Sequence, residues 1–543
     1  MQSRNAIESI GAPAGLFHWI QDEMVVVVRL HRRPAPEAQD ALVEQIRTQL
    51  NSVLAQHKLA LEPYGTGSRW HNGQIPTPLR RRSFIFGLHR QQPLIAIFFH
   101  VRHADPAVRD PVPMALSYLQ SKLEQLVQSG LHVVSAMPNW LVTAAPLLYA
   151  EGGPAALPRP APRPAIQPVG NAPARWHVSL LDPGIPLDPR EAEEVIVAVL
   201  DTAQPRDQVA TAAEQFDNAL LQQLANELSS ENGSFEIEYD RYPLAQDICT
   251  GHDNYGEPRY YAMPDHGLFV AGLIRDIAPG ARIRLIRVLD DFGGGDLYNL
   301  FAALTDLEQE LVSGTIRRLV INLSLTIMPD IRRLPYIWFD HREWPSAQLS
   351  RVTRALAHIE EGLRLLFESL YAHGALVVAA AGNDSTLANK QGLQPQPPRA
   401  PARYDTTLSV TSVNSRFAPS RFANLACMPP LNAGVATFGG DSYGSIDAHK
   451  WPDAVRGVYI SPTFPGGAQN TSAWADWSGS SFATAIISAL GAHLLALGWS
   501  TPNAIARIAA GRERRTDFLF GSHPDVPALL ANVIRVQQQF EAR

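Results

Sequence analysis

Five short, mostly apolar runs in the second half of the chain constrain its fold more than any other feature. They occupy residues 195–200, 283–289, 319–323, 376–381 and 408–413. Their hydrophobicity is continuous instead of alternating, which is typical of strands buried on both faces. Segments with helical periodicity lie between them, for example 297–311 and 350–371. The sequence therefore predicts an α/β fold, a doubly wound parallel sheet with helices above and below it.

A proline-rich stretch at residues 152–173 marks a boundary. Its seven prolines are Pro154, Pro158, Pro160, Pro162, Pro164, Pro168 and Pro173. This composition favours an extended, semi-rigid tether over regular structure. We therefore expect an N-terminal domain over 1–150, a linker over 151–175 and a larger domain over 176–543.

The N-terminal 150 residues predict a smaller α+β domain. Strands are expected at 24–30, 83–88, 94–101 and 131–136, and helices at 36–57 and 114–129. The order β-α-β-β-α-β is typical of a ferredoxin-like, split βαβ sandwich. We find no nucleophile, metal cluster or phosphate loop in this part. His89, His100 and His103 lack the spacing of metal ligands, so we expect structural roles for them.

Composition narrows the classes of protein to consider. The chain has 543 residues, 45% hydrophobic and 18% charged, with a formal charge of -6, so nucleic acid and anionic membranes are not expected partners. No apolar stretch approaches the roughly 20 residues that cross a bilayer. Residues 1–17 lack the pattern of a secretory signal, and Cys249 and Cys427 alone predict no disulfide framework or zinc site. We therefore expect a cytoplasmic protein.

Ser481 and Asp201 are the first candidates for chemistry. Ser481 lies among small residues, in Gly479-Ser-Ser-Phe-Ala, before an apolar helix over 486–497. A helix N-terminus supplies N–H groups for developing negative charge, but such turns also serve close packing. Asp201 follows the run 195–200, at the strand end where doubly wound sheets place their sites. It could orient an imidazole, or simply cap a turn.

His266 and Asn383 occupy similar positions. His266 opens the stretch His-Gly-Leu-Phe-Val-Ala-Gly, whose small residues let a helix start pack tightly beneath an imidazole. Asn383 follows Gly382 at the end of the run 376–381, where its amide could stabilise an oxyanion. Each also has a structural reading, His266 as a core residue and Asn383 as a residue in a left-handed turn.

In the order Asp, His, Asn, Ser, these segments resemble the subtilase family, the subtilisin-like serine proteases, over residues 176–511. The Asp-first order separates this family from chymotrypsin-like and α/β-hydrolase enzymes. The stretches 277–289, 321–325 and 404–414 agree with the resemblance. It implies a serine endopeptidase that forms an acyl-enzyme. Its nucleophile would be Ser481, its general acid/base His266, its orienting carboxylate Asp201 and its oxyanion donor Asn383.

The resemblance also implies where a peptide or protein substrate binds. An extended peptide would lie between two strand edges, and residues 379–382 would form a wall of the primary pocket. Main-chain pairing then gives affinity, and the pockets give selectivity. The expected substrate-binding residues are Gly293, Gly294, Gly295, Ser324, Leu325, Thr326, Ala380 and Gly382.

Several positions depart from the family pattern without removing a catalytic atom. They are Ala203, Leu268, Ser480, Phe482 and Ala485. Thr326 stands where glycine is usual, so its side chain could narrow a specificity pocket. We expect no cofactor and no metal ligands; calcium, which is common in the family, stays unassigned because its loops have no match here.

The N-terminal domain resembles family prodomains in its position. This predicts an inhibitory or folding-assisting role on the protease domain in cis, with a targeting or partner-binding module as the alternative. For the whole chain, one alternative is a catalytically idle subtilase-fold scaffold or binding protein, against which the four retained positions argue. Another is an esterase using Ser481 with Asp517 and His523, which would need glycine where Ala483 stands.

Overall fold

The computed structural model describes most of both predicted domains. The described residues are 19–64, 81–108, 110–144, 157–161, 177–178, 195–242, 244, 262–327, 357–385, 395–414, 418–426, 434–441, 454–510, 513–514, 529–530 and 533–534. Residues 1–17, most of the predicted linker, both cysteines, Asp517 and His523 lie outside these ranges. Among the described helices, none is both long enough and apolar enough to span a membrane.

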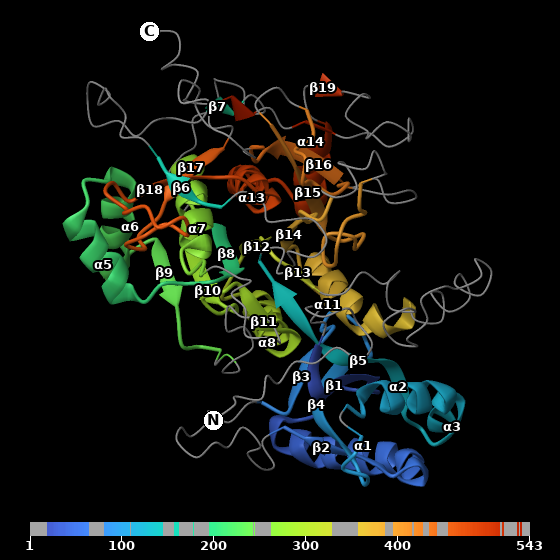
Figure 1. Ribbon diagram of the computed structural model, residues 1–543. Helices are drawn as coiled ribbons and strands as arrows, with labels where there is room; N and C mark the ends of the chain where they lie inside the picture. The colour runs from blue at the N-terminus through green and yellow to red at the C-terminus, as the bar shows by residue number, and fades with distance from the viewer. Residues whose placement is uncertain are drawn as a thin grey trace.

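All five predicted strands of the larger domain are neighbours in one nine-stranded sheet, in the order β9-β10-β8-β12-β14-β15-β16-β20-β19 (Figure 1). All pairs are parallel except the last, β20 with β19. The α/β fold class is thus confirmed. The bounds are β8 (Val195–Asp201), β9 (Phe235–Glu238), β10 (Arg282–Arg287), β12 (Arg318–Leu323), β14 (Leu376–Ala380), β15 (Leu408–Val413), β16 (Gly434–Phe438), β19 (Glu513–Arg514) and β20 (Leu529–Leu530).

Helices cover both faces of this sheet, which explains why its strands are apolar throughout. Val197 and Val199 of β8 belong to a core with α7 and α13, whereas Ala198 and Leu200 belong to a second core with α8 and α11. Successive side chains of a strand point to opposite faces, so one run serves both cores. The helices are α5 (Arg206–Gln215), α6 (Ala219–Ser229), α7 (His266–Ile277), α8 (Leu297–Val312), η3 (Ala357–Glu360), α11 (Glu361–Ala372), α13 (Ser480–Ala496) and α14 (Thr501–Ala510).

The N-terminal domain is built on an antiparallel sheet of order β5-β1-β4-β2, with β3 also paired to β4. The sequence prediction missed β2, and the helix expected over 114–129 is divided at Lys122. Otherwise the order of elements agrees with a split βαβ sandwich. The bounds are β1 (Trp19–Arg29), η1 (Pro36–Ala38), α1 (Gln39–Leu54), η2 (Ala55–His57), β2 (Leu59–Pro63), β3 (Ser83–Phe86), β4 (Leu94–His103), α2 (Val112–Ser121), α3 (Leu123–Gln128) and β5 (His132–Thr143).

The two domains share a hydrophobic core. Met24 and Val26 of β1 pack with the N-terminal domain's own helices, whereas Val25 and Val27 join the core of α8 and α11. The N-terminal sheet therefore lies against these two helices of the larger domain, as Figure 1 shows. The sheet also continues into the larger domain, because β5 pairs with β11 (Gly294–Asp296) and β13 (Thr326–Ile327).

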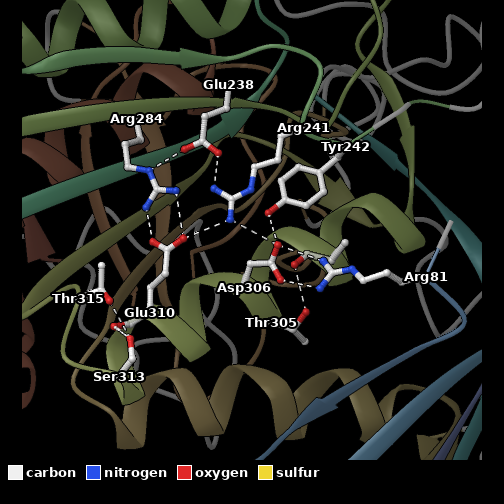
Figure 2. A network of polar contacts seen from close by, with 11 residues as sticks. Arg81, Glu238, Arg241, Tyr242, Arg284, Thr305, Asp306, Glu310, Ser313 and Thr315 are labelled. Carbon is white, nitrogen blue, oxygen red and sulfur yellow. Dashed lines mark hydrogen bonds and ion pairs between the residues drawn. The ribbon is translucent and has the colours of Figure 1, made fainter. Parts of the chain in front are cut away.

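Polar contacts border this shared core. Figure 2 shows Arg81 of the N-terminal domain reaching Asp306 of α8, with nitrogen–oxygen distances of 2.8 and 3.0 Å. Asp306 also accepts a 2.8 Å hydrogen bond from the hydroxyl of Tyr242. Burial and the neighbouring Asp306 raise the pKa of Tyr242, so this hydroxyl stays protonated. The network continues through Arg241 to Glu238 at 2.6 Å.

The described part of the predicted linker is not a free tether. Within it, β6 (Arg159–Pro160) is an edge strand beside β18 (Trp474–Trp477), which pairs in turn with β17 (Val455–Val458). Proline is tolerated in an edge strand because its missing N–H costs no internal ladder bond. Farther along, β7 (His177–Val178) pairs with β21 (Val533–Ile534). The boundaries at 150 and 175 remain sequence predictions.

Candidate active site

Asp201 and His266 are joined by a hydrogen bond at the carboxyl end of the parallel sheet. Asp201 ends β8 and His266 begins α7, and 2.8 Å separates Nδ1 of His266 from Oδ1 of Asp201. The same carboxylate oxygen accepts the backbone N–H of Thr202 at 2.7 Å. Both side chains are buried. A carboxylate held in this way favours the tautomer with hydrogen on Nδ1, so Nε2 is left to act as a base.

Gly267 allows α7 to begin against the end of β8. Its N–H donates to Oγ1 of Thr202 at 3.0 Å. A Cβ at this position would lie 2.0 Å from the carbonyl oxygen of Thr202, closer than any tolerated contact. The small residue after the histidine is therefore required by packing, as the sequence indicated.

Asp265 anchors the start of α7 on its other side, and sequence reasoning assigned it no role. Its buried carboxylate accepts the backbone N–H groups of Ile460 at 2.9 Å and Ser461 at 3.2 Å, and the hydroxyl of Ser461. Burial raises the pKa of Asp265, while these donors oppose the rise. An acidic residue directly before His266 was the available signal.

Ser481 lies in the first turn of α13, where backbone N–H groups lack acceptors within the helix. Its hydroxyl oxygen lies 3.4 Å from the carbonyl oxygen of Ser324, and the Ser324 hydroxyl donates to the carbonyl of Ser481 at 3.0 Å. The next side chain, Phe482, has its ring 5.7 Å from that of His266. The serine thus lies at the end of β12, and the residue that follows it contacts the imidazole. Its hydroxyl is turned toward Ser324, a geometry that can tighten when substrate binds.

Phe482, one of the departures from the family pattern, is a core residue. Its ring packs 4.5 Å from Phe269 and 5.3 Å from Trp477, and the ring of Trp477 lies edge-on to His266 at 5.4 Å. These aromatic side chains give the imidazole an apolar support.

Asn383 faces the start of α13. Its Oδ1 accepts the N–H of Ser480 at 3.0 Å, so its NH₂ group remains for another acceptor. The preceding Gly382 has φ +112°, and a Cβ there would lie 2.5 Å from Nδ2 of Asn424. Asn424 holds this loop by accepting from the N–H of Asp384 at 2.9 Å and donating to the carbonyl of Ala381 at 3.2 Å. Sequence reasoning missed Asn424, since it lies in a segment without periodicity.

The two strand edges expected to bind substrate flank the end of β5. Gly294 and Thr326 both face Thr143 in antiparallel pairs. Beyond it, the N–H of Ala144 donates to the carbonyl of Gly293 at 2.9 Å. The hydroxyl oxygens of Thr143 and Thr326 are 3.4 Å apart. Residues 141–144 of the N-terminal domain thus lie where the sequence places a substrate peptide.

The other predicted site residues lie near the same strand ends. Gly295 of β11 faces Val142, and Leu325 is buried between Ser324 and β13. Ala380 ends β14, directly before the loop that carries Asn383. In the described part of the chain, no group of three His, Cys, Asp or Glu ligands lies at this site.

The fold and the site define a subtilisin-like peptidase, and comparison with known families agrees. Residues 192–516 match the model of the subtilase family, and the chain belongs to that family of serine peptidases. Among solved structures, it is similar to the crystal structure of a lanthipeptide protease, at 17% identity and a TM-score of 0.37, over 64% of this chain and 88% of that one. No curated protein matches the chain.

Proposed function

We propose that the protein is a serine endopeptidase whose triad is Asp201, His266 and Ser481. The Ser481 hydroxyl would attack the peptide carbonyl and pass its proton to Nε2 of His266. That nitrogen would then protonate the leaving amine, and water would hydrolyse the acyl-enzyme. The observation that carries the proposal is the buried 2.8 Å hydrogen bond between Asp201 and His266, beside the first turn of α13.

Asn383 and the backbone N–H of Ser481 would stabilise the tetrahedral oxyanion. Support for this role comes from the bond between Oδ1 of Asn383 and the N–H of Ser480, which leaves the amide NH₂ as a donor. Loss of one such donor lowers kcat by about 10²–10³-fold. Asn383→Ala should fall within this range, whereas loss of a purely structural Asn would be seen in stability instead.

We further propose that the N-terminal domain inhibits the peptidase in cis. Its strand β5 occupies both edges that a substrate would need, and main-chain pairing of this kind accepts many sequences. The domain is also fixed by a shared core, so β5 stays at a high effective concentration. A substrate must therefore displace residues 141–144 before it can bind.

Labelling of the full chain with a fluorophosphonate probe tests both proposals. Thr143→Pro should release β5, because Thr143 has a strand on each side and proline removes its N–H. Thr143→Val keeps the N–H and the branched shape and serves as the control. We expect strong labelling of Ser481 in Thr143→Pro, weak labelling in Thr143→Val, and none after Ser481→Ala.

The outcomes separate the two proposals. A folded Thr143→Pro chain in which Ser481 does not react would contradict the peptidase and favour an idle scaffold. Equal labelling of the uncut parent and Thr143→Pro would contradict inhibition alone. Cleavage of an unbiased peptide library at internal bonds would support an endopeptidase, whereas turnover of small esters without peptide cleavage would favour an esterase.

A further inference from the structure

A second group of polar side chains converges away from the active site, at the contact between the domains. His89 lies in the turn between β3 and β4, Glu308 lies on α8, and His373 follows α11. One ligand atom from each of the three lies within 4.8 Å of the other two. The group thus combines one side chain of the N-terminal domain with two of the larger domain.

Glu308 is wholly buried, and its two oxygens have unequal surroundings. Its Oε1 accepts the N–H groups of Gly87 and Leu88, each at 3.1 Å, and the hydroxyl of Ser369. Its Oε2 is buried without a hydrogen-bond partner among the described residues. A buried carboxylate oxygen without a partner is unfavourable unless a proton or a cation satisfies it.

A ring nitrogen of each histidine lies close to this carboxylate. Nδ1 of His89 lies 2.9 Å from the hydroxyl of Ser369. When Glu308 is ionised, the single hydroxyl hydrogen of Ser369 goes to its carboxylate, so Nδ1 of His89 is the donor to Ser369 and Nε2 keeps its lone pair. Nε2 of His373 is buried without a hydrogen bond among the described residues, 3.7 Å from Oε1 of Glu308.

We propose that His89, Glu308 and His373 bind one divalent transition-metal ion, with Zn²⁺ as the best match. Two imidazoles and a carboxylate form a ligand set that zinc accepts, with water in the fourth position. Calcium is a poorer match because it takes six or more oxygen ligands. The hydrogen bonds that fix Oε1 of Glu308 hold this ligand in place before metal binds.

Zinc binding requires the three ligand side chains to move slightly closer together. Ligand atoms around tetrahedral zinc are about 3.3 Å apart, given metal–ligand distances near 2.0–2.1 Å. His89 is exposed on a turn, so its ring can approach the fixed Glu308 without disturbing the core.

Nearby charges should moderate the affinity. Burial raises the pKa of Glu308, and the nearby Arg33 opposes this rise. Arg90 lies close to His89. Arg90 is itself paired with Glu368.

Because the ligands come from both domains, a bound metal would hold the N-terminal domain in its docked position. This consequence does not depend on catalysis.

Zinc titration of the full Ser481→Ala chain tests the site, since this variant avoids self-cleavage. After removal of metal with a chelator, we expect one Zn²⁺ per chain by calorimetry and by elemental analysis of the desalted complex. His89→Ala and His373→Gln should each weaken binding at least about tenfold, the effect of losing a ligand or its support. Zinc should also raise the Tm of Ser481→Ala, but not that of the His89→Ala variant.

His103→Ala is the matched control, because it removes another histidine of the same domain, one that is partly exposed. Glu308→Gln would remove the third ligand. If that variant fails to fold, His89→Ala still tests the site, because His89 lies on an exposed turn. Absence of stoichiometric zinc from the folded chain would overturn the proposal. Equal zinc affinity of the parent and both histidine variants would also overturn it, because zinc would then bind elsewhere. Glu308 would in that case be a protonated residue in a network without metal.

Discussion

The parallel and antiparallel sheets are both covered on two faces, but by different means. The parallel sheet is covered by helices of its own domain, and its strand ends carry Asp201 and the loop of Asn383. One face of the antiparallel sheet packs against the helices of its own domain, and the other face packs against α8 and α11 of the larger domain. Its strand β5 pairs with β11 and β13, the two edges where we propose that substrate binds. Strand ends thus carry the proposed catalytic residues, and a paired strand provides the proposed control.

The largest effect is expected where the parallel sheet holds the imidazole. In Asp201→Asn, the amide can donate to Nδ1 of His266 and stabilise the wrong tautomer. We expect kcat to fall by about 10⁴-fold with little change in Tm, as such substitutions do in serine peptidases. Peptide-library cleavage in the Thr143→Pro background measures this. A loss under tenfold would mean that Asp201 is only a turn residue.

Replacement of Gly267, which lets α7 pack against the end of β8, should have the next largest effect. Gly267→Ala would place Cβ against the carbonyl of Thr202 and push the start of α7 away from β8. A displacement of about 1 Å at a catalytic group costs about 10²-fold in rate. Gly272→Ala on the same helix is the control, because its Cβ would meet Val458 at 3.5 Å, an ordinary contact. Equal rates for the two variants would show that His266 tolerates the shift.

Asp290, in the turn before β11, makes the stability of the protein depend on pH. Burial raises its pKa to about 7, although it accepts the N–H groups of Phe292 at 3.0 Å and Gly294 at 2.9 Å. The folded state therefore binds this proton more tightly than the unfolded chain. Its stabilising effect is complete below pH 4 and is lost as the pH rises through 7.

Asp290→Asn keeps an acceptor for both N–H groups and removes the titration. In the Ser481→Ala background, the decline of Tm between pH 5 and pH 8 should be smaller in this variant than in the parent. Asp217→Asn, which changes an exposed carboxylate between α5 and α6, is the control. Identical pH profiles for the parent and Asp290→Asn would contradict the assignment.

The sequence predicted what depends on local pattern and missed what depends on distant contact. The five strands were predicted because burial on both faces makes them continuously apolar, whereas β9 alternates (Phe235-Glu-Ile-Glu) and lies at the sheet edge. Asp201, His266, Asn383 and Ser481 lie at strand or helix ends, where position alone is informative.

Strand β5 and the proposed metal ligands have no such signal in the sequence. In the sequence, nothing distinguishes Thr143 from other strand residues. Its pairing with both β11 and β13 is seen only in the folded protein. Gly87 and Glu308, which share a hydrogen bond, are 221 positions apart in sequence. Their convergence depends on docking of the two domains, and one sequence contains no pattern that reports such docking.

The smallest effect is expected at the polar border of the shared core (Figure 2). Arg81 has a side-chain exposure of 46%, so Arg81→Ala should lower the free energy of unfolding by less than about 1 kcal/mol, and less still at high salt. Asp306 keeps its bond from Tyr242, so no buried charge is left without a partner. Denaturant unfolding of the Ser481→Ala chain measures this. A loss of several kcal/mol would mean that docking depends on this ion pair more than on the apolar face of β1, and the contrast between the two sheets would need revision.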